Sequence, residues 1–179
     1  MYYVLYVGDG KEQHAENFIR SYVPEQFYSH CFHLQRHMKK KFRGSWCDSY
    51  SKLIPGYIFV ESNRIEDFSE KAMKTLLPLK VLGMEKNREG EFFRPLDERE
   101  TAWIKMLTPS SSLKDPDDMC YMVELSRVSI GEDGKISILS GPLKHLQSQI
   151  KKFNLHKRIA EVEMDFMGNQ SSLYLGIEF

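Results

Sequence analysis

The 179-residue sequence has few of the features that assign a chain to a familiar class at once. No apolar run approaches the roughly 20 residues that a membrane-spanning helix needs, so we expect no membrane partner. The three cysteines are odd in number and show no CxxC spacing, which argues against a disulfide framework. The first residues carry neither a basic leader nor a small-residue cleavage site, and we expect a cytoplasmic protein.

Signatures of catalysis and cofactor binding are also missing. We find no nucleophile elbow, phosphate-binding loop or paired His/Glu motif, and Gly8-Asp9-Gly10 is a turn signal. His30, Cys31, His33 and His37 are close in sequence, but successive strand residues point to opposite faces and no second ligand cluster follows. The sequence therefore predicts no enzymatic activity, no catalytic residues, no cofactor and no metal site.

Acidic residues are absent from two tracts of a chain whose net charge is zero. From Gln26 to Cys47 there are five Lys or Arg and three His; from Gly134 to Ala160 there are six and two. Clustered positive charge suits phosphate groups, so we expect two local contacts with anionic partners. The alternative for each tract is a solvated face with no partner.

Apolar periodicity predicts an α+β domain over residues 1–107, with an antiparallel sheet backed by helices. The predicted helices span Lys11–Tyr22, Ile65–Leu76 and about Asp97–Leu107, with Asn63 and Asp97 as helix caps. The predicted strands are Tyr2–Val7, Phe27–Leu34, Ile54–Val60, Val81-Leu82 and a hairpin partner at Phe92-Phe93. The basic tract between the second and third strands leads into a loop around Gly44.

The segment from Thr108 to Asp118 is rich in Pro, Ser and Asp without periodicity, and we place a flexible linker at residues 108–122. A second domain, residues 123–179, alternates short apolar runs with turns, as in a small closed β-barrel. Its predicted strands are Val123–Ile130, Lys135–Leu139, Ser148–Phe153, Arg158–Asp165 and Ser172–Ile177.

Two motifs organise these domains. In Lys52–Val60 (KLIPGYIFV), Pro55-Gly56 forces a sharp backbone change before a strand of aromatic and β-branched residues. Alternation would send Tyr57 and Phe59 to one face, although an ordinary core strand entered through a turn fits as well. The second motif is Gly141–Phe153, in which a Gly-Pro turn precedes a basic strand.

In this order the motifs resemble the NusG family of transcription elongation and antitermination factors. The N-terminal (NGN) domain is matched by Tyr2–Leu5, the helix start at Gly10–Glu12, Ile54–Val60 and Pro95-Leu96. The family's KOW (SH3-like) barrel is matched by Gly141–Leu143 and Phe166–Gly168. The resemblance covers almost the whole chain and implies an NGN domain, a linker and a small all-β KOW domain.

The resemblance implies that the N-terminal domain binds the clamp helices of bacterial RNA polymerase through an apolar pocket. The matching residues are Tyr6, Ile54, Tyr57 and Phe59; the alternative is that some are simply core. It also places a basic hairpin near non-template DNA, here Lys39, Lys40, Lys41 and Arg43, with Phe42 or Trp46 available to stack on bases. Some specialised paralogues carry a threonine-rich patch where this chain reads Ile65–Ser69, so that contact does not carry over.

The C-terminal tract favours RNA as the partner of the second domain. The residues assigned to RNA binding are Lys144, His145, Lys151, Lys152, Lys157 and Arg158. This combination is most similar to the LoaP-type antiterminator paralogues, which pair a polymerase-binding domain with a domain that recognises a leader RNA hairpin. Two alternatives stay open: a housekeeping NusG whose barrel binds Rho or the ribosome, and a stand-alone KOW RNA-binding or ribosomal module. We expect a monomer.

Overall fold

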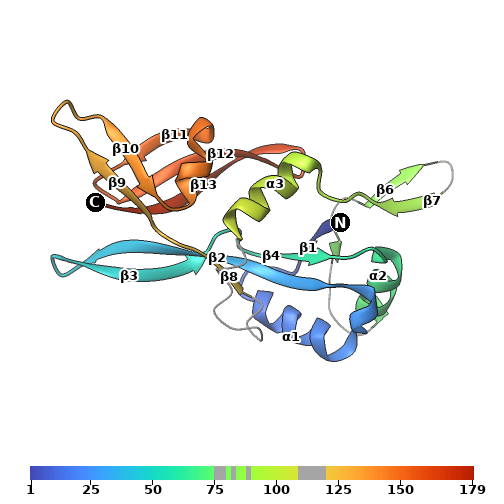
Figure 1. The fold of residues 1–179 in the computed structure, drawn as a ribbon. Coiled ribbons are helices and arrows are strands. Elements are labelled where there is room, and N and C mark those ends of the chain that lie inside the picture. The colour runs from blue at the N-terminus through green and yellow to red at the C-terminus, as the bar shows by residue number, and fades with distance from the viewer. Residues whose placement is uncertain (75–79, 82–83, 88–89, 109–119) are drawn as a thin grey trace. The chain divides into compact units, whose positions relative to one another are not determined.

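The computed structural model describes residues 1–74, 80–81, 84–87, 90–108 and 120–179 of a mixed α+β chain (Figure 1). The central part of the predicted linker, residues 109–119, lies outside the described residues. The chain divides into two compact units. The first holds Met1–His33 and Ile54–Thr101, and the second holds Leu34–Leu53 and Tyr121–Phe179. No helix in the described ranges is long and apolar enough to cross a membrane.

An antiparallel sheet forms the centre of the first unit. β1 (Tyr2–Tyr6) pairs with β4 (Tyr57–Glu61) along its whole length and with β5 (Lys80–Val81) at its end. The start of β2 pairs with β4 on the other side, from His30 opposite Glu61 to Phe32 opposite Phe59. A separate hairpin joins β6 (Met84–Asn87) to β7 (Gly90–Phe93), so Phe92 and Phe93 pair with β6 and not with the predicted strand at Val81-Leu82.

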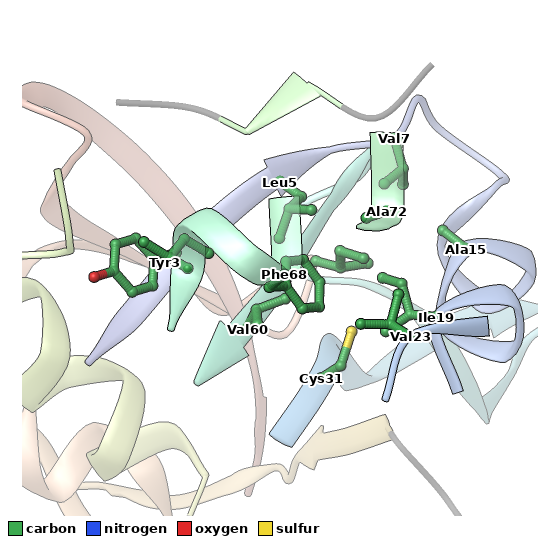
Figure 2. Packing of buried hydrophobic residues seen from close by; sticks show 12 residues of the cluster. Tyr3, Leu5, Val7, Ala15, Ile19, Val23, Cys31, Val60, Phe68 and Ala72 are labelled. Atoms are coloured by element: carbon green, nitrogen blue, oxygen red, sulfur yellow. The ribbon is translucent and has the colours of Figure 1, made fainter. Parts of the chain in front are cut away.

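One face of this sheet packs against α1 (Glu12–Tyr22) and α2 (Ile65–Lys74). Alternate residues of β1 and β4 meet small and aromatic side chains from the helices, and each buried side chain contributes about 1.5–3 kcal/mol. The buried hydrophobic cluster between the sheet and the helices includes Tyr3, Leu5, Val7, Ile58, Val60, Ala15, Ile19, Phe68 and Ala72 (Figure 2). The predicted first helix is confirmed to within one residue, and the second begins at Ile65 as predicted.

The predicted cap of α3 (Glu98–Leu107) is also confirmed. The Glu100 amide donates to Asp97 Oδ1 at 2.8 Å, and the Asp97 amide donates to Glu100 Oε2 at 2.9 Å. This reciprocal capping box satisfies two amides that would otherwise lack partners at the helix start. The spacing of Asp97 and Glu100 in the sequence therefore correctly predicts where α3 begins.

A long hairpin replaces the predicted loop around Gly44. β2 runs from His30 to Phe42 and pairs with β3 (Ser45–Lys52), so the predicted end of this strand at Leu34 is wrong. The two-residue turn Arg43-Gly44 has φ of 48° and 88°, which matches the twist of a tight hairpin (Figure 1). The second half of β2 has few apolar residues and is still a strand, because it pairs along its length with the polar strand β3.

The second unit also contains a five-stranded sheet in the order β10-β9-β13-β12-β11. The five predicted C-terminal strands are confirmed in number and order along the chain. β13 pairs antiparallel with β12 and parallel with β9, and short 3-10 helices occupy Pro142–His145 and Gln147–Gln149. The strand bounds are Ser126–Ile130 (β9), Ile136–Ser140 (β10), Ile150–Asn154 (β11), Ile159–Phe166 (β12) and Asn169–Glu178 (β13), and β8 (Cys120–Val123) pairs with β2.

Candidate functional site

The Pro55-Gly56 turn is fixed by a buried carboxylate. Gly56 has φ of 86°, and a side chain there would place its Cβ 3.0 Å from Tyr6 Cε2 and 3.2 Å from the Asp9 nitrogen. The Gly56 amide donates to Glu12 Oε1 at 2.7 Å, and Glu12, in the first turn of α1, is 0 % exposed. A buried amide that lost this acceptor would be left unsatisfied at a considerable cost, so the bond from α1 holds the turn in one conformation.

Two tyrosines lie side by side next to this turn. Tyr6 is opposite Tyr57 in the β1–β4 register, and their ring centroids are 5.3 Å apart at 58°. Tyr6 is 44 % exposed, and Tyr57 and Ile54 are half-buried. Three of the four residues predicted to bind polymerase therefore have surface to offer.

Phe59 differs from the other three predicted pocket residues. It is 0 % exposed and stacks on Phe32, with ring centroids 5.6 Å apart at 22°. A side chain with no exposed surface cannot contact a partner helix, so the prediction that Phe59 lines an open pocket does not match its position. Alternation gives the face of a strand residue but not what covers that face, which is why Tyr57 and Phe59 differ.

A buried acid–histidine pair lies beneath the first unit's surface, and sequence reasoning missed it. His33 Nδ1 is 2.7 Å from Glu16 Oε1, and both residues are buried. Burial raises the pKa of the Glu16 carboxyl and the charge of Glu12 adds to the rise, while the bond to His33 offsets part of it. The two residues are 17 apart in sequence, so no local spacing could have revealed the pair.

The tip of the β2–β3 hairpin carries free positive charge. Lys39 Nζ is 2.6 Å from Asp48 Oδ1. The hydrogen bond from Lys39 lowers the pKa of the Asp48 carboxyl most, and a hydrogen bond from His37 lowers it further. Lys40, Lys41 and Arg43 are exposed, and no carboxylate of the described residues pairs with them. Phe42 is 63 % exposed, and the Arg43 guanidinium carbon is 5.2 Å from its ring centroid.

Arg158 contacts two aromatic rings of the second unit. Its guanidinium carbon is 4.4 Å from the centroid of Trp46 and 4.7 Å from that of Phe179. Its Nε is buried and has no hydrogen-bond partner among the described residues. Arg158 is therefore half-buried, whereas the other cations predicted to bind RNA are exposed.

The same hairpin approaches β13 at a residue without a side chain. A Cβ at Gly176 would lie 2.4 Å from the carbonyl oxygen of His37 and 2.5 Å from Leu125 Cδ2. Arg36, the residue before His37, donates from Nη1 to the Tyr174 carbonyl oxygen at 2.7 Å. Within this unit, backbone of β2 therefore lies directly against β13.

The Gly141-Pro142-Leu143 motif anchors the loop that presents Lys144 and His145. Gly141 has φ of 92°, and a Cβ there would lie 2.6 Å from Ser126 Cα. The Leu143 amide donates to Ser126 Oγ at 3.0 Å, and the Leu143 side chain is buried. This anchoring leaves Lys144 and His145 exposed at the end of the 3-10 helix.

The remaining predicted RNA contacts lie on the outer face of the sheet. Lys151 is paired with Glu163 at 2.9 Å, whereas Lys152 and Lys157 line a hollow of about 330 Å³ and have no carboxylate partner among the described residues. The hollow is completed by Asn154, Ile159, Glu161 and Tyr174. Sequence reasoning missed Glu161 and Tyr174, whose signal is their alternation with the buried residues Ala160, Val162 and Leu175.

In the described part of the chain, no three His, Cys, Asp or Glu side chains are grouped closely enough to hold a metal ion. The structure brings together Tyr6 and Tyr57 in the first unit, and Lys152 and Lys157 in the second. No protein-family model matches the sequence, and no curated protein matches it either.

Proposed function

We propose that this chain is a transcription processivity or antitermination factor of NusG type. In this proposal the first unit binds the clamp helices of bacterial RNA polymerase, and the C-terminal sheet binds a leader RNA hairpin. The observation that carries the proposal is the half-exposed pair Tyr6 and Tyr57 beside a Pro-Gly turn that a buried carboxylate fixes.

The geometry of this pair suits a helical partner. Tyrosine has few rotatable bonds, so two packed tyrosines lose little conformational entropy when they bind. Ile54 adds apolar surface on the other side of the Pro55-Gly56 turn. Contacts dominated by one or two preordered aromatic anchors are typical of the residues that contribute most to binding energy.

Charge in the second unit supports a nucleic-acid role. Lys40, Lys41 and Arg43 are neighbours of the exposed Phe42 in the hairpin, a combination that suits a single-stranded backbone with one stacked base and fits the proposed contact with non-template DNA. Lys144, His145, Lys152 and Lys157 are exposed on the C-terminal sheet and its loops, where they can contact RNA phosphates.

The polymerase contact is tested with Tyr57→Ala in the full chain. We expect affinity for bacterial core RNA polymerase, measured by biolayer interferometry, to fall at least tenfold because a central aromatic anchor is lost. Tyr22→Ala is the matched control: Tyr22 is an exposed tyrosine of the same unit, on α1. Equal binding by wild type and Tyr57→Ala, with both variants folded by circular dichroism, would refute the polymerase proposal.

The RNA contact is tested separately, by gel shift of the full chain against the leader RNA of its own operon. We expect the double variant Lys152→Ala/Lys157→Ala to bind more weakly, and to show a shallower dependence of affinity on salt because two phosphate contacts are gone. If the leader RNA binds no better than a scrambled hairpin, while Rho or the ribosome is retained by the immobilised chain, the housekeeping alternative replaces the RNA proposal.

A further inference from the structure

The hollow on the C-terminal sheet combines an aromatic ring, two cations, an amide and a carboxylate. In the strand registers, Lys152 is opposite Glu161, and Glu161 is opposite Tyr174, so these three side chains form a row across β11, β12 and β13. The neighbouring row is Asn154, Ile159 and Gly176. Gly176 does not line the hollow, because the backbone of β2 and the side chain of Leu125 pack against it, and the volume of about 330 Å³ is at the small end for ligand pockets.

The aromatic and apolar residues provide a surface for a flat ligand. Tyr174 is 40 % exposed although it lies on a strand whose next three residues are buried. Ile159, half-buried, lines the same hollow. An exposed tyrosine ring next to aliphatic surface is the usual platform on which an unpaired nucleobase stacks.

The two lysines supply charge for phosphates. Lys152 comes from β11 and Lys157 from the turn that follows it, and neither ammonium group forms a direct ion pair with a carboxylate of the described residues. Lys151, next to Lys152 in sequence, is by contrast paired with Glu163. The cations that face the hollow are thus the ones left free, as a nucleotide with phosphates on both sides requires.

The polar groups of the hollow discriminate between bases. Glu161 Oε1 accepts from the Ser172 hydroxyl at 3.0 Å, which orients the carboxylate and leaves Oε2 as an acceptor. Asn154 Oδ1 accepts from the Lys157 amide at 2.9 Å, which leaves its NH₂ group to donate. A carboxylate acceptor beside an amide donor matches guanine, whose N1–H and N2–H₂ donate while its O6 accepts. Adenine would direct its N1 acceptor at the carboxylate.

We propose that this hollow binds a single unpaired guanosine of the RNA, with the base on Tyr174 and its Watson–Crick edge against Glu161 and Asn154. The flanking phosphates contact Lys152 and Lys157. This inference rests on the proposed RNA-binding function and adds to it a base specificity and the residues that read the base.

The test uses the full chain and four fluorescein-labelled heptamers, 5′-UUUXUUU-3′, in which X is G, A, C or U. Fluorescence anisotropy gives a dissociation constant for each. We expect the G heptamer to bind about tenfold more tightly than the others, as one well-made bidentate contact provides. Glu161→Gln should reduce this preference to less than about threefold, because a glutamine presents one acceptor and one donor to the two guanine donors.

The matched control is Asp165→Asn, which removes the same charge from an exposed position farther along β12 and should keep the preference for G. Tyr174→Ala should weaken binding of all four heptamers about tenfold through loss of stacking. Since Tyr174→Ala alters a strand, its fold is checked by thermal melting. The isosteric Glu161→Gln keeps the proposal testable if Tyr174→Ala does not fold.

Other outcomes overturn the inference. If the wild type binds all four heptamers equally, or if Glu161→Gln keeps the tenfold preference, the hollow does not read guanine, while RNA binding itself stands. If none of the heptamers binds but the leader hairpin does, the inference fails and the proposed function survives; if neither binds, both fail. Displacement of the G heptamer by a hexaglutamate peptide at equal concentration identifies the hollow as a site for acidic protein segments and also overturns the proposal.

Discussion

Ionisable side chains occupy opposite environments in the two units. In the first unit Glu12, Glu16 and His33 are all buried. Glu12 accepts a hydrogen bond from the Gly56 amide, and Glu16 and His33 are hydrogen-bonded to each other. In the second unit Lys144, Lys152 and Lys157 are exposed, and no described carboxylate pairs with them. Buried charges persist where bonds satisfy them, and free surface cations suit binding to anions.

The comparison teaches that charge has a different task in each unit. In the first, the Glu12 carboxylate fixes the Pro55-Gly56 turn, beside which Tyr6 and Tyr57 are partly exposed. In the second, hydrophobic burial and glycine turns fix the backbone, so that charge is left at the surface. Four substitutions test this difference, in order of expected effect.

The largest effect is expected for Glu12→Ala. Removing the carboxylate leaves the Gly56 amide buried without its acceptor, so the free energy of unfolding should fall by about 3 kcal/mol. Urea denaturation measures the loss. Glu98→Ala is the control, since Glu98 is an exposed acid in the first turn of α3 and shares the favourable helix-dipole position. Similar losses in the two variants would mean that charge in the first unit is not structural.

Arg158→Ala should have the next largest effect, about 1 kcal/mol, because two cation–π contacts are lost. Arg158 is the exception to the comparison, since its guanidinium is covered by Trp46 and Phe179. RNA affinity should fall less than for Lys152→Ala, which leaves stability unchanged. A large loss of RNA affinity without a loss of stability would instead indicate that Arg158 contacts RNA, as the sequence predicts.

Glu16→Gln should alter the pH dependence of stability more than stability at any one pH, because the side chain keeps its shape. The folded-state pKa of Glu16 is raised above the ordinary value of 4.5. The protonated form is therefore favoured in the fold, so the contribution of Glu16 is fully present below that value and is lost as pH rises through the folded pKa. The unfolding free energy of wild type minus that of Glu16→Gln should decrease as pH rises from 4.5. A constant difference would contradict the assigned shift.

The smallest effect is expected for Glu163→Gln, which breaks the exposed ion pair with Lys151. Pairs of this kind contribute little to stability in water, and urea denaturation should find no change. Freeing Lys151 should instead raise RNA affinity, by less than about twofold. A measurable loss of stability would show that charge in the C-terminal sheet also has a structural part.

Local signals in the sequence predicted much of this fold. Helix α1 and the cap of α3 follow from 3.6-residue periodicity and from Asp97 three residues before Glu100. The C-terminal strands follow from apolar alternation between turns. These features depend on neighbours in sequence, which is why a single sequence contains them.

Features set by contacts distant in sequence could not be predicted in this way. The long hairpin was missed because β2 is polar after Leu34 and is stabilised by its pairing with β3. Phe59 was placed at an open surface although Phe32 covers it. Of the candidate site, Tyr6, Ile54 and Tyr57 follow from the resemblance to the NusG family, whereas the roles of Glu12, Glu161 and Tyr174 depend on contacts between segments distant in sequence.

Gly176 offers an experimental tool. Its backbone φ is not in the left-handed region, so alanine is conformationally acceptable there, yet the added methyl would meet the His37 carbonyl oxygen at 2.4 Å. One added methyl at this position would push β2 away from β13 without altering any charge. A Gly176→Ala protein would thus report how far the two basic surfaces of the second unit, which we propose bind nucleic acid, depend on one another, with electrostatics held constant.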